Sequence, residues 1–226
     1  MTPYSPAFRV IHLVSALLIF VLIPLGVYMK GVDDVQTLIT LYDLHKSLGV
    51  SLLGIILLRI YLRARTVKSE NSLNHSKLVR NLSHLTHWSL YLLLLIMPIS
   101  GWLMSNAAGF AVSFFGLFNL PDLIDKSDES LVIFQQIHFY AATALLGLIS
   151  LHAAGALKHH FIDQDNTLKR MSSNNLNAAG GVIVASIAAL FLVTSTYLWI
   201  STSGEINDSH DGAHGTAHSS AHDGSH

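Results

Sequence analysis

Two of the four histidines in one long apolar stretch of the chain, residues 136–161, are widely spaced along it, and the stretch contains no acidic residue. They are His138 and His152, 14 residues apart. In an α-helix, 14 steps of about 100° return a side chain to within about 40° of the same face and separate the two imidazoles by about 21 Å along the axis. Because the hydrocarbon core of a bilayer is about 30 Å thick, the stretch predicts a membrane-spanning helix with one imidazole toward each side. Ionisable side chains inside a span are costly and usually functional, which indicates two stacked binding sites.

The composition indicates an integral membrane protein. Of the 226 residues, 51% are hydrophobic and only 12% are charged, whereas soluble domains average about 25% charged residues. We therefore expect membrane lipid, and no nucleic acid, among the partners. The chain contains no cysteine. This excludes disulfides, thiolate metal sites, a cysteine nucleophile and the C-x-x-C-H motif that attaches haem covalently.

The apolar stretches predict five membrane spans, each close to the roughly 20 residues that a bilayer requires. The first three cover about residues 8–28, 44–62 and 84–104, and the fourth begins near Leu131. The fifth has no histidine and no charge, and its Tyr197 and Trp199 suit a membrane interface. The predicted fold is thus an all-α four-helix transmembrane bundle with an appended helix and a disordered tail. Its parts are the bundle domain (1–171), a linker (172–179), the fifth span (180–200) and the tail (201–226).

The distribution of lysine and arginine predicts the orientation in the membrane. Ten of the 13 Lys and Arg residues fall on the side that contains the N-terminus, many of them in the loop between the second and third spans. Only Lys30, Lys46 and Lys126 fall on the other side. Because these residues accumulate in cytoplasmic loops, we expect a cytoplasmic N-terminus and, after five spans, a tail on the outer side.

Two further histidines match the first two in depth. His12 lies about one turn inside the first span, on the cytoplasmic side with His152, and His45 starts the second span, on the outer side with His138. Facing imidazoles across a slot fill both axial positions of a haem iron, which favours electron transfer over oxygen binding. For one histidine alone, an interhelical hydrogen bond or an interfacial position is the simpler interpretation. Other metal ions are less favoured, because no carboxylate lies at this depth. Two matched pairs indicate two non-covalent b haems.

Other polar residues lie near the predicted haem sites. His84 and His87 are three apart, hence on one helix face, and with His159 they lie at the cytoplasmic depth of a quinone head group. We interpret them as quinone-contacting groups, with simple anchoring at the interface as the alternative. Arg9, Lys46 and Lys158 are placed to pair with haem propionates.

The sequence resembles the bacterial cytochrome b561 family of four-helix dihaem membrane cytochromes. The matching segments are RVIHLVSALL, LYDLHKSLGVSLL, LSHLTHWSLYLLLLIMPISGWLM and IHFYAATALLGLISLHAAGALKHHFIDQDNTLKRM, which together cover about residues 6–171. His12, His45, His138 and His152 match the family's haem-ligand positions. The resemblance implies a bacterial inner-membrane location, and the orientation predicted from lysine and arginine then puts the tail in the periplasm. The fifth span and the tail are departures from the usual short members.

The resemblance also implies transmembrane electron transfer linked to the quinone pool, and in the bacterial branch oxidation of superoxide with quinone as acceptor. We expect an unidentified one-electron donor on the outer side and quinone or quinol as the other reactant. One alternative is the cytochrome b subunit of a hydrogenase or dehydrogenase complex. An alternative of another class is a metal-handling membrane protein that uses the tail and contains no haem.

The tail has a regular histidine pattern. Five histidines recur every four residues, namely His210, His214, His218, His222 and His226. Four carboxylates lie near them, on Glu205, Asp208, Asp211 and Asp223. Interspersed Gly and Ser disfavour a helix in the free state. Imidazole suits zinc, copper and nickel, and carboxylates can supplement it. The tail is therefore predicted to bind these ions, with a merely solubilising low-complexity segment as the alternative.

Deletion of residues 201–226 tests the tail. The truncated protein is expected to lose micromolar zinc or copper binding while both haem spectra stay unaltered, and binding by the intact protein should weaken below about pH 6.5 as the imidazoles protonate. Titration of both proteins with the metal ions measures this. Equal affinity of the two proteins would show that the tail is not the site.

Overall fold

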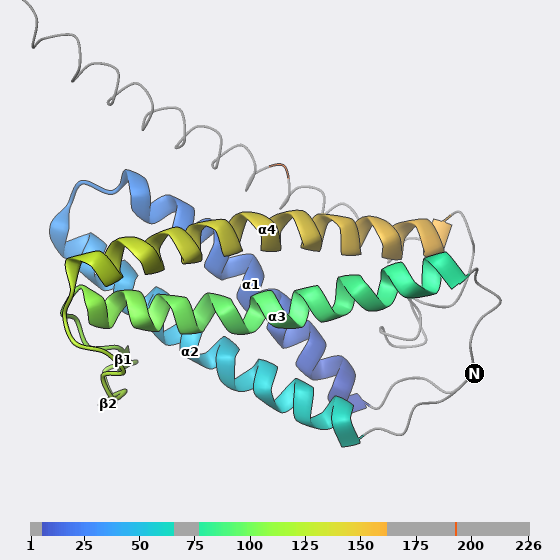
Figure 1. The fold of residues 1–226 in the computed structure, drawn as a ribbon, viewed down its shortest axis with the longest axis horizontal. Helices are drawn as coiled ribbons and strands as arrows, with labels where there is room; N and C mark the ends of the chain where they lie inside the picture. Colours follow the sequence, from blue (N-terminus) through green and yellow to red (C-terminus); the bar gives the residue numbers. More distant parts are fainter. Residues whose placement is uncertain (1–5, 66–76, 162–192, 194–226) are drawn as a thin grey trace, which may run out of the picture.

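The computed structural model describes residues 6–65, 77–161 and 193. Figure 1 shows four long helices and one short hairpin. The elements in chain order are α1 (Pro6–Tyr28), the short 3-10 helix η1 (Met29–Gly31), α2 (Val35–Arg65), α3 (Lys77–Ala107), β1 (Ser113–Phe114), β2 (Phe118–Asn119) and α4 (Asp128–Phe161). The linker and the tail lie outside the described residues, and so does the predicted fifth span except for Val193.

Each of the four helices is long and apolar enough to cross a membrane, which confirms the predicted helical membrane bundle. The helices extend beyond the predicted spans, since α2 begins at Val35 and α3 at Lys77. The hydropathy pattern marks only the apolar part of a helix, whereas polar turns continue it into the interface. Asp34 caps α2 by accepting a 2.8 Å hydrogen bond from the Thr37 N–H. Hydrogen bonds from Thr37 lower the pKa of Asp34 below its usual range.

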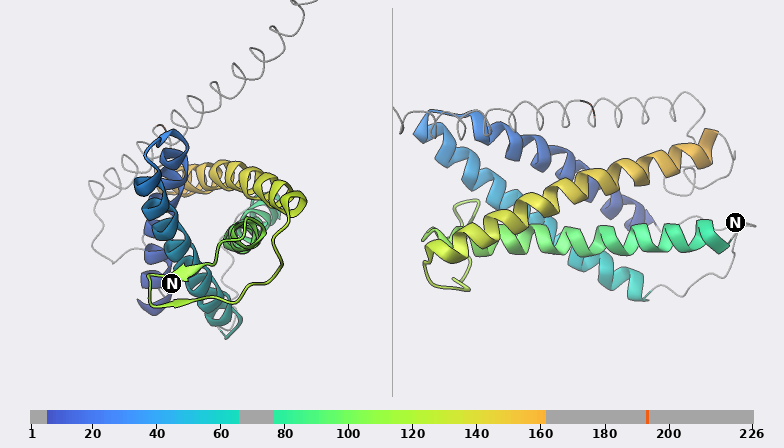
Figure 2. Two further views of the ribbon diagram at one scale, coloured as in Figure 1. Left: turned by 90° about the vertical axis from the view of Figure 1, so that its left-hand side faces the viewer. Right: turned by 45° about the horizontal axis from the view of Figure 1, so that its top comes forward.

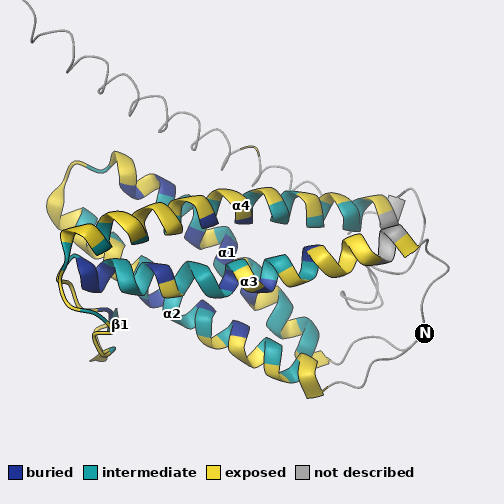
Figure 3. Ribbon diagram, viewed as in Figure 1, coloured by how far each residue is buried: buried dark blue, intermediate teal, exposed yellow. Residues whose placement is uncertain are grey.

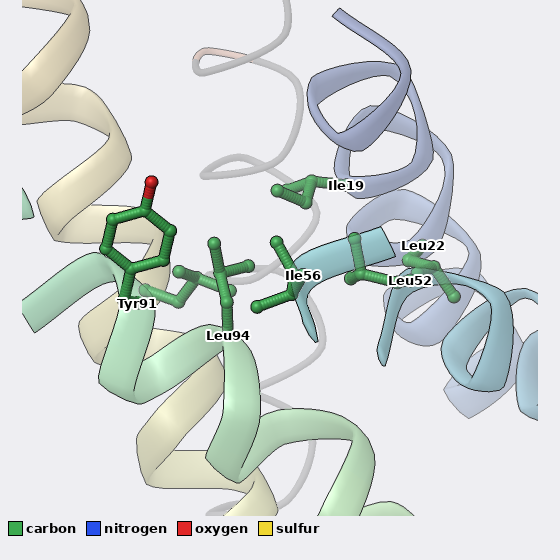
Figure 4. Close-up of a cluster of buried hydrophobic side chains, with 7 residues drawn as sticks. Ile19, Leu22, Leu52, Ile56, Tyr91 and Leu94 are labelled. Carbon is green, nitrogen blue, oxygen red and sulfur yellow. The ribbon is translucent and has the colours of Figure 1, made fainter. Parts of the chain in front are cut away.

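The helices form two antiparallel pairs, α1 with α2 and α3 with α4, and α2 also packs against α3. The two pairs cross at an angle, as the two views in Figure 2 show. Where they cross, buried side chains from all four helices form one cluster: Ile19, Leu22, Leu52, Ile56, Tyr91, Leu94 and Leu145 (Figure 4). Among them, Ile56 of α2 is fully buried. The cluster thus holds the two pairs together at the middle of the bundle.

The outward faces of the helices remain apolar. Leu13 and Leu17 of α1, Leu57 of α2 and Leu92 of α3 are all more than half exposed, and exposed residues run along every helix in Figure 3. In a bilayer these side chains meet acyl chains. Lipid is as apolar as leucine, so helix association depends on close packing and polar contacts rather than on exclusion of water.

A β-hairpin lies at the end of the bundle where α3 and α4 connect, and no strand was predicted there. Its two strands pair Ser113 with Asn119 and Phe114 with Phe118. Phe115 and Gly116 both have positive φ, 49° and 72°, as a type I′ turn requires. The buried Ser47 hydroxyl of α2 accepts a 2.9 Å hydrogen bond from the Phe115 N–H. The hairpin is therefore fastened to α2 two residues after His45.

Candidate functional site

The structure brings together the two histidine pairs that were matched by depth. His12 of α1 faces His152 of α4, with ring centroids 6.5 Å apart and ring planes at 88°. His45 of α2 faces His138 of α4, with centroids 6.4 Å apart and planes at 69°. We call them the α1–α4 pair and the α2–α4 pair. Because α4 contributes one histidine to each, the 14-residue spacing in that helix separates the pairs by about 21 Å along its axis.

The separation within each pair suits a shared metal ion. An imidazole nitrogen that binds a metal lies about 2 Å from it, so two imidazoles on opposite sides of one ion have centroids about 6 Å apart. Within the described residues, no group of three or more His, Cys, Asp or Glu side chains is placed to hold a bare ion. A two-imidazole site therefore suits a metal whose remaining ligands come from a macrocycle, as in haem with two axial histidines.

Both pairs also contain an unsatisfied polar atom. Within the part of the chain that the structure describes, the Nδ1 atoms of His12 and His45 are buried without a hydrogen-bond partner. A buried donor or acceptor without a partner costs about 1–3 kcal/mol. The protein thus holds imidazoles whose bonding capacity its own side chains do not fill, which fits residues that bind a further group.

A cavity adjoins the α1–α4 pair. Its polar lining comes from His12, Ser15, Arg59, His87, Tyr91 and His152, and its apolar lining from Ala16, Ile19, Phe20, Leu90, Leu94 and Ile149. The His87 ring lies 5.3 Å from that of His152, edge to face. This is shorter than the separation of about 6 Å for two imidazoles on opposite sides of one ion. His87 is therefore a neighbour of the pair and not its third member.

Arg59 of α2 brings a positive charge into this cavity. Its Nη1 donates a 3.3 Å hydrogen bond to Ser15 Oγ, and its guanidinium carbon lies 5.4 Å from the centre of the Tyr91 ring. Among the described residues, the Nε atom of Arg59 and the hydroxyl of Tyr91 find no hydrogen-bond partner and are buried. Arg59 and Tyr91 can therefore offer N–H and O–H donors to a polar or anionic group in the cavity.

The α2–α4 pair lies in close contact with residues of the neighbouring helices. The Nδ1 atom of His138 lies 3.1 Å from the Met97 carbonyl oxygen and 3.1 Å from Ser100 Oγ, both on α3. Glycines face both rings. A Cβ atom at Gly26 would lie 3.3 Å from Cε1 of His45, and one at Gly101 would lie 3.2 Å from Cε1 of His138. Both distances are shorter than ordinary van der Waals contact, so glycine is what lets these rings lie against the neighbouring helices.

The other predicted site residues are distributed unevenly. His84 is exposed, unlike its neighbour His87. Lys46 forms a 2.9 Å ion pair with Asp43 and donates a hydrogen bond to the Ala111 carbonyl. Arg9 is partly buried in the first turn of α1, and Lys158 is exposed near the end of α4. The side chain of His159 and the five tail histidines lie outside the described part of the chain. The assignment of ligands and propionate partners stays a prediction.

Sequence reasoning missed several residues that surround the pairs. Arg59 had a detectable signal, because it interrupts an apolar run inside the second span and an intramembrane charge is a functional candidate by default. Tyr91, Ser100, Gly26 and Gly101 had none, since such residues are common in membrane helices. Their relation to the histidines depends on which helix faces which.

Four membrane-spanning helices with two stacked pairs of facing histidines define a membrane electron-transfer protein of the cytochrome b type. The family model of prokaryotic cytochrome b561 matches residues 3–174, and the chain belongs to this family. It is a multi-pass bacterial membrane protein of transmembrane electron transfer, and membership implies haem b.

Curated relatives agree with this assignment. The chain is 33% identical over 168 residues to cytochrome b561 homolog 2 of Escherichia coli, covering 71% of this chain and 86% of that protein. It is 30% identical over 128 residues to the probable superoxide oxidase CybB of Yersinia pestis, covering 57% and 72%. A third relative, cytochrome b561 homolog 1 of Escherichia coli, is 37% identical over 87 residues, covering 38% and 49%.

The glycine contacts predict a selective effect on haem binding. In Gly26→Val, a β-branched side chain with a restricted χ1 angle would press on His45, so the protein should lose much of the haem at the α2–α4 pair and retain the other. Haem-to-protein ratio and visible spectra measure this. Gly49→Val, on α2 where an added Cβ meets nothing within 4 Å, is the matched control. Equal haem loss in both variants would refute the steric role of Gly26.

Proposed function

We propose that the protein conducts electrons across the membrane through two b haems, one held by the α1–α4 pair and one by the α2–α4 pair. Electrons pass between a one-electron donor on the outer side and quinone on the cytoplasmic side. The observation that carries this proposal is the separation of the ring centroids, 6.5 Å and 6.4 Å, in two pairs at different depths of one bundle. Family membership supports the cofactor.

The chain's own residues account for the type of chemistry. Bound haem would supply an iron that gains and loses a single electron. His12 and His152, or His45 and His138, would hold this iron and leave no place on it for oxygen. Six apolar side chains also line the cavity beside the α1–α4 pair, which disfavours water there. These features favour electron conduction over oxygen activation.

The cavity beside the α1–α4 pair supports a quinone site. His87, Tyr91 and Arg59 direct imidazole, phenol and guanidinium groups to it, and such donors suit the carbonyl oxygens of a quinone head group. The short distance between the rings of His87 and His152 would place the quinone next to that haem. His84, being exposed, is a weaker candidate than His87.

The proposed orientation rests on the distribution of lysine and arginine, and the proposed electron donor rests on a relative. The excess of Lys and Arg beside the α1–α4 pair supports a cytoplasmic location of that side, and the α2–α4 pair would then serve the outer side. The relative from Yersinia pestis is described as a probable superoxide oxidase. Superoxide is a one-electron reductant, so we propose it as the donor, with quinone as the acceptor.

Substitution of single histidines tests the two haem sites. His12→Ala or His152→Ala should remove the haem of the α1–α4 pair and leave the other, and His45→Ala or His138→Ala should do the converse. Redox titration of the visible spectrum distinguishes the two haems in each variant. If His12→Ala and His45→Ala lost the same haem, the assignment of pairs would be wrong.

Substitution of the cavity residues tests the quinone site. His87→Leu and Tyr91→Phe should slow reoxidation of the reduced haems by added quinone severalfold, because each removes a donor from the cavity. Haem content should stay intact. His84→Ala is the matched control and should change the rate less, since that side chain is exposed. Unchanged stopped-flow reoxidation in both cavity variants would place the quinone elsewhere.

A further inference from the structure

We propose that Ser100 and Gly101 of α3 are positioning residues for His138, and that Ser100 lowers the reduction potential of the haem at the α2–α4 pair. This inference rests on the proposed function, because it requires that His138 bind haem iron. It concerns a cradle that consists of the Met97 carbonyl, the Ser100 hydroxyl and the space left by Gly101.

The cradle determines which nitrogen of His138 carries the proton. A carbonyl oxygen only accepts hydrogen bonds, so the 3.1 Å contact between Met97 O and Nδ1 requires a proton on Nδ1. Nε2 then keeps its lone pair and is the nitrogen able to bind a metal. Hydrogen bonding of one ring nitrogen in this way sets the tautomer and the orientation of metal-binding histidines.

Ser100 adds a second acceptor to the same N–H group. Its hydroxyl donates to the Met97 carbonyl at 3.0 Å, so its own proton points away from the imidazole and its oxygen lone pairs are free to accept. Ser100 Oγ lies 3.1 Å from Nδ1, and the residue is only 3% exposed. Because water does not compete there, the hydrogen bond retains its strength.

Gly101 lets the ring lie within reach of both acceptors. A Cβ atom at this position would lie 3.2 Å from Cε1 and 3.5 Å from Nδ1 of His138. The shorter distance would force the ring to move by a few tenths of an ångström. Since the hydrogen bonds to Met97 and Ser100 involve the same edge of the ring, such a movement would weaken them.

The cradle makes His138 unlike the histidine that faces it. Within the described residues, Nδ1 of His45 is buried without a hydrogen-bond partner, whereas Nδ1 of His138 has two acceptors. A histidine that donates its second N–H becomes a more basic ligand. A more basic axial ligand stabilises the oxidised iron and lowers its reduction potential. The haem at the α2–α4 pair is thereby made a stronger reductant than its histidines alone would make it.

The test is a redox titration of the full-length membrane protein with Ser100→Ala. The midpoint potential of one haem is expected to become more positive while that of the second stays unchanged and haem content is retained. Ser100→Thr, which keeps the hydroxyl, should restore the wild-type potential. Ser150→Ala is the matched control, because the Ser150 hydroxyl donates to the Leu146 carbonyl of its own helix, and it should shift neither haem.

A second variant, Gly101→Ala, distinguishes a specific effect on His138 from a general loss of fold. Gly101→Ala should change the low-spin electron paramagnetic resonance signal of the same haem that Ser100→Ala shifts, since it moves the same ring. Unchanged potentials in Ser100→Ala with two haems retained would overturn the inference and leave the proposed function intact. A wild-type protein without haem would instead overturn the proposed function. An equal shift in Ser150→Ala would also overturn the inference.

Discussion

The cost of placing an imidazole inside a membrane is the constraint on which the rest of the structure depends. A polar ring in hydrocarbon requires a partner, yet each of the four central histidines faces another imidazole at a distance too long for a direct hydrogen bond and suited to an intervening ion. The bundle satisfies this constraint by crossing two helix pairs, so that α4 meets α1 at one depth and α2 at the other. The apolar cluster at the crossing point keeps the two sites apart.

The two histidine pairs have different surroundings, a cavity at one and close packing at the other. The α1–α4 pair opens to a cavity with a guanidinium, a phenol and a third imidazole, where a reactant can meet donors of hydrogen bonds. The α2–α4 pair is held tightly by glycines and by the Met97–Ser100 acceptors. A hairpin fastened to α2 lies beside it. One end of the bundle thus has a cavity with polar groups in its lining, and the other holds its two histidine rings in close contact with α1 and α3.

The four spans and the two histidine pairs could be predicted, because hydropathy and a 14-residue spacing are properties of one helix at a time. The hairpin could not, because it depends on the buried Ser47 of a distant helix. The sequence shows Arg59 as a charge inside a span, but its place in the cavity depends on how α2 packs against α1 and α3. Gly101 and Ser100 could not be recognised as site residues along the chain, because their contacts are with the ring of His138 on another helix.

The central claim is that each facing pair of histidines binds one haem iron from both sides. Electron paramagnetic resonance of the purified oxidised protein, combined with haem quantification, tests it most directly. Two b haems per chain, both giving low-spin signals typical of two axial imidazoles, are the predicted result. A single haem per chain, or a high-spin signal from an iron with an open axial position, would contradict it.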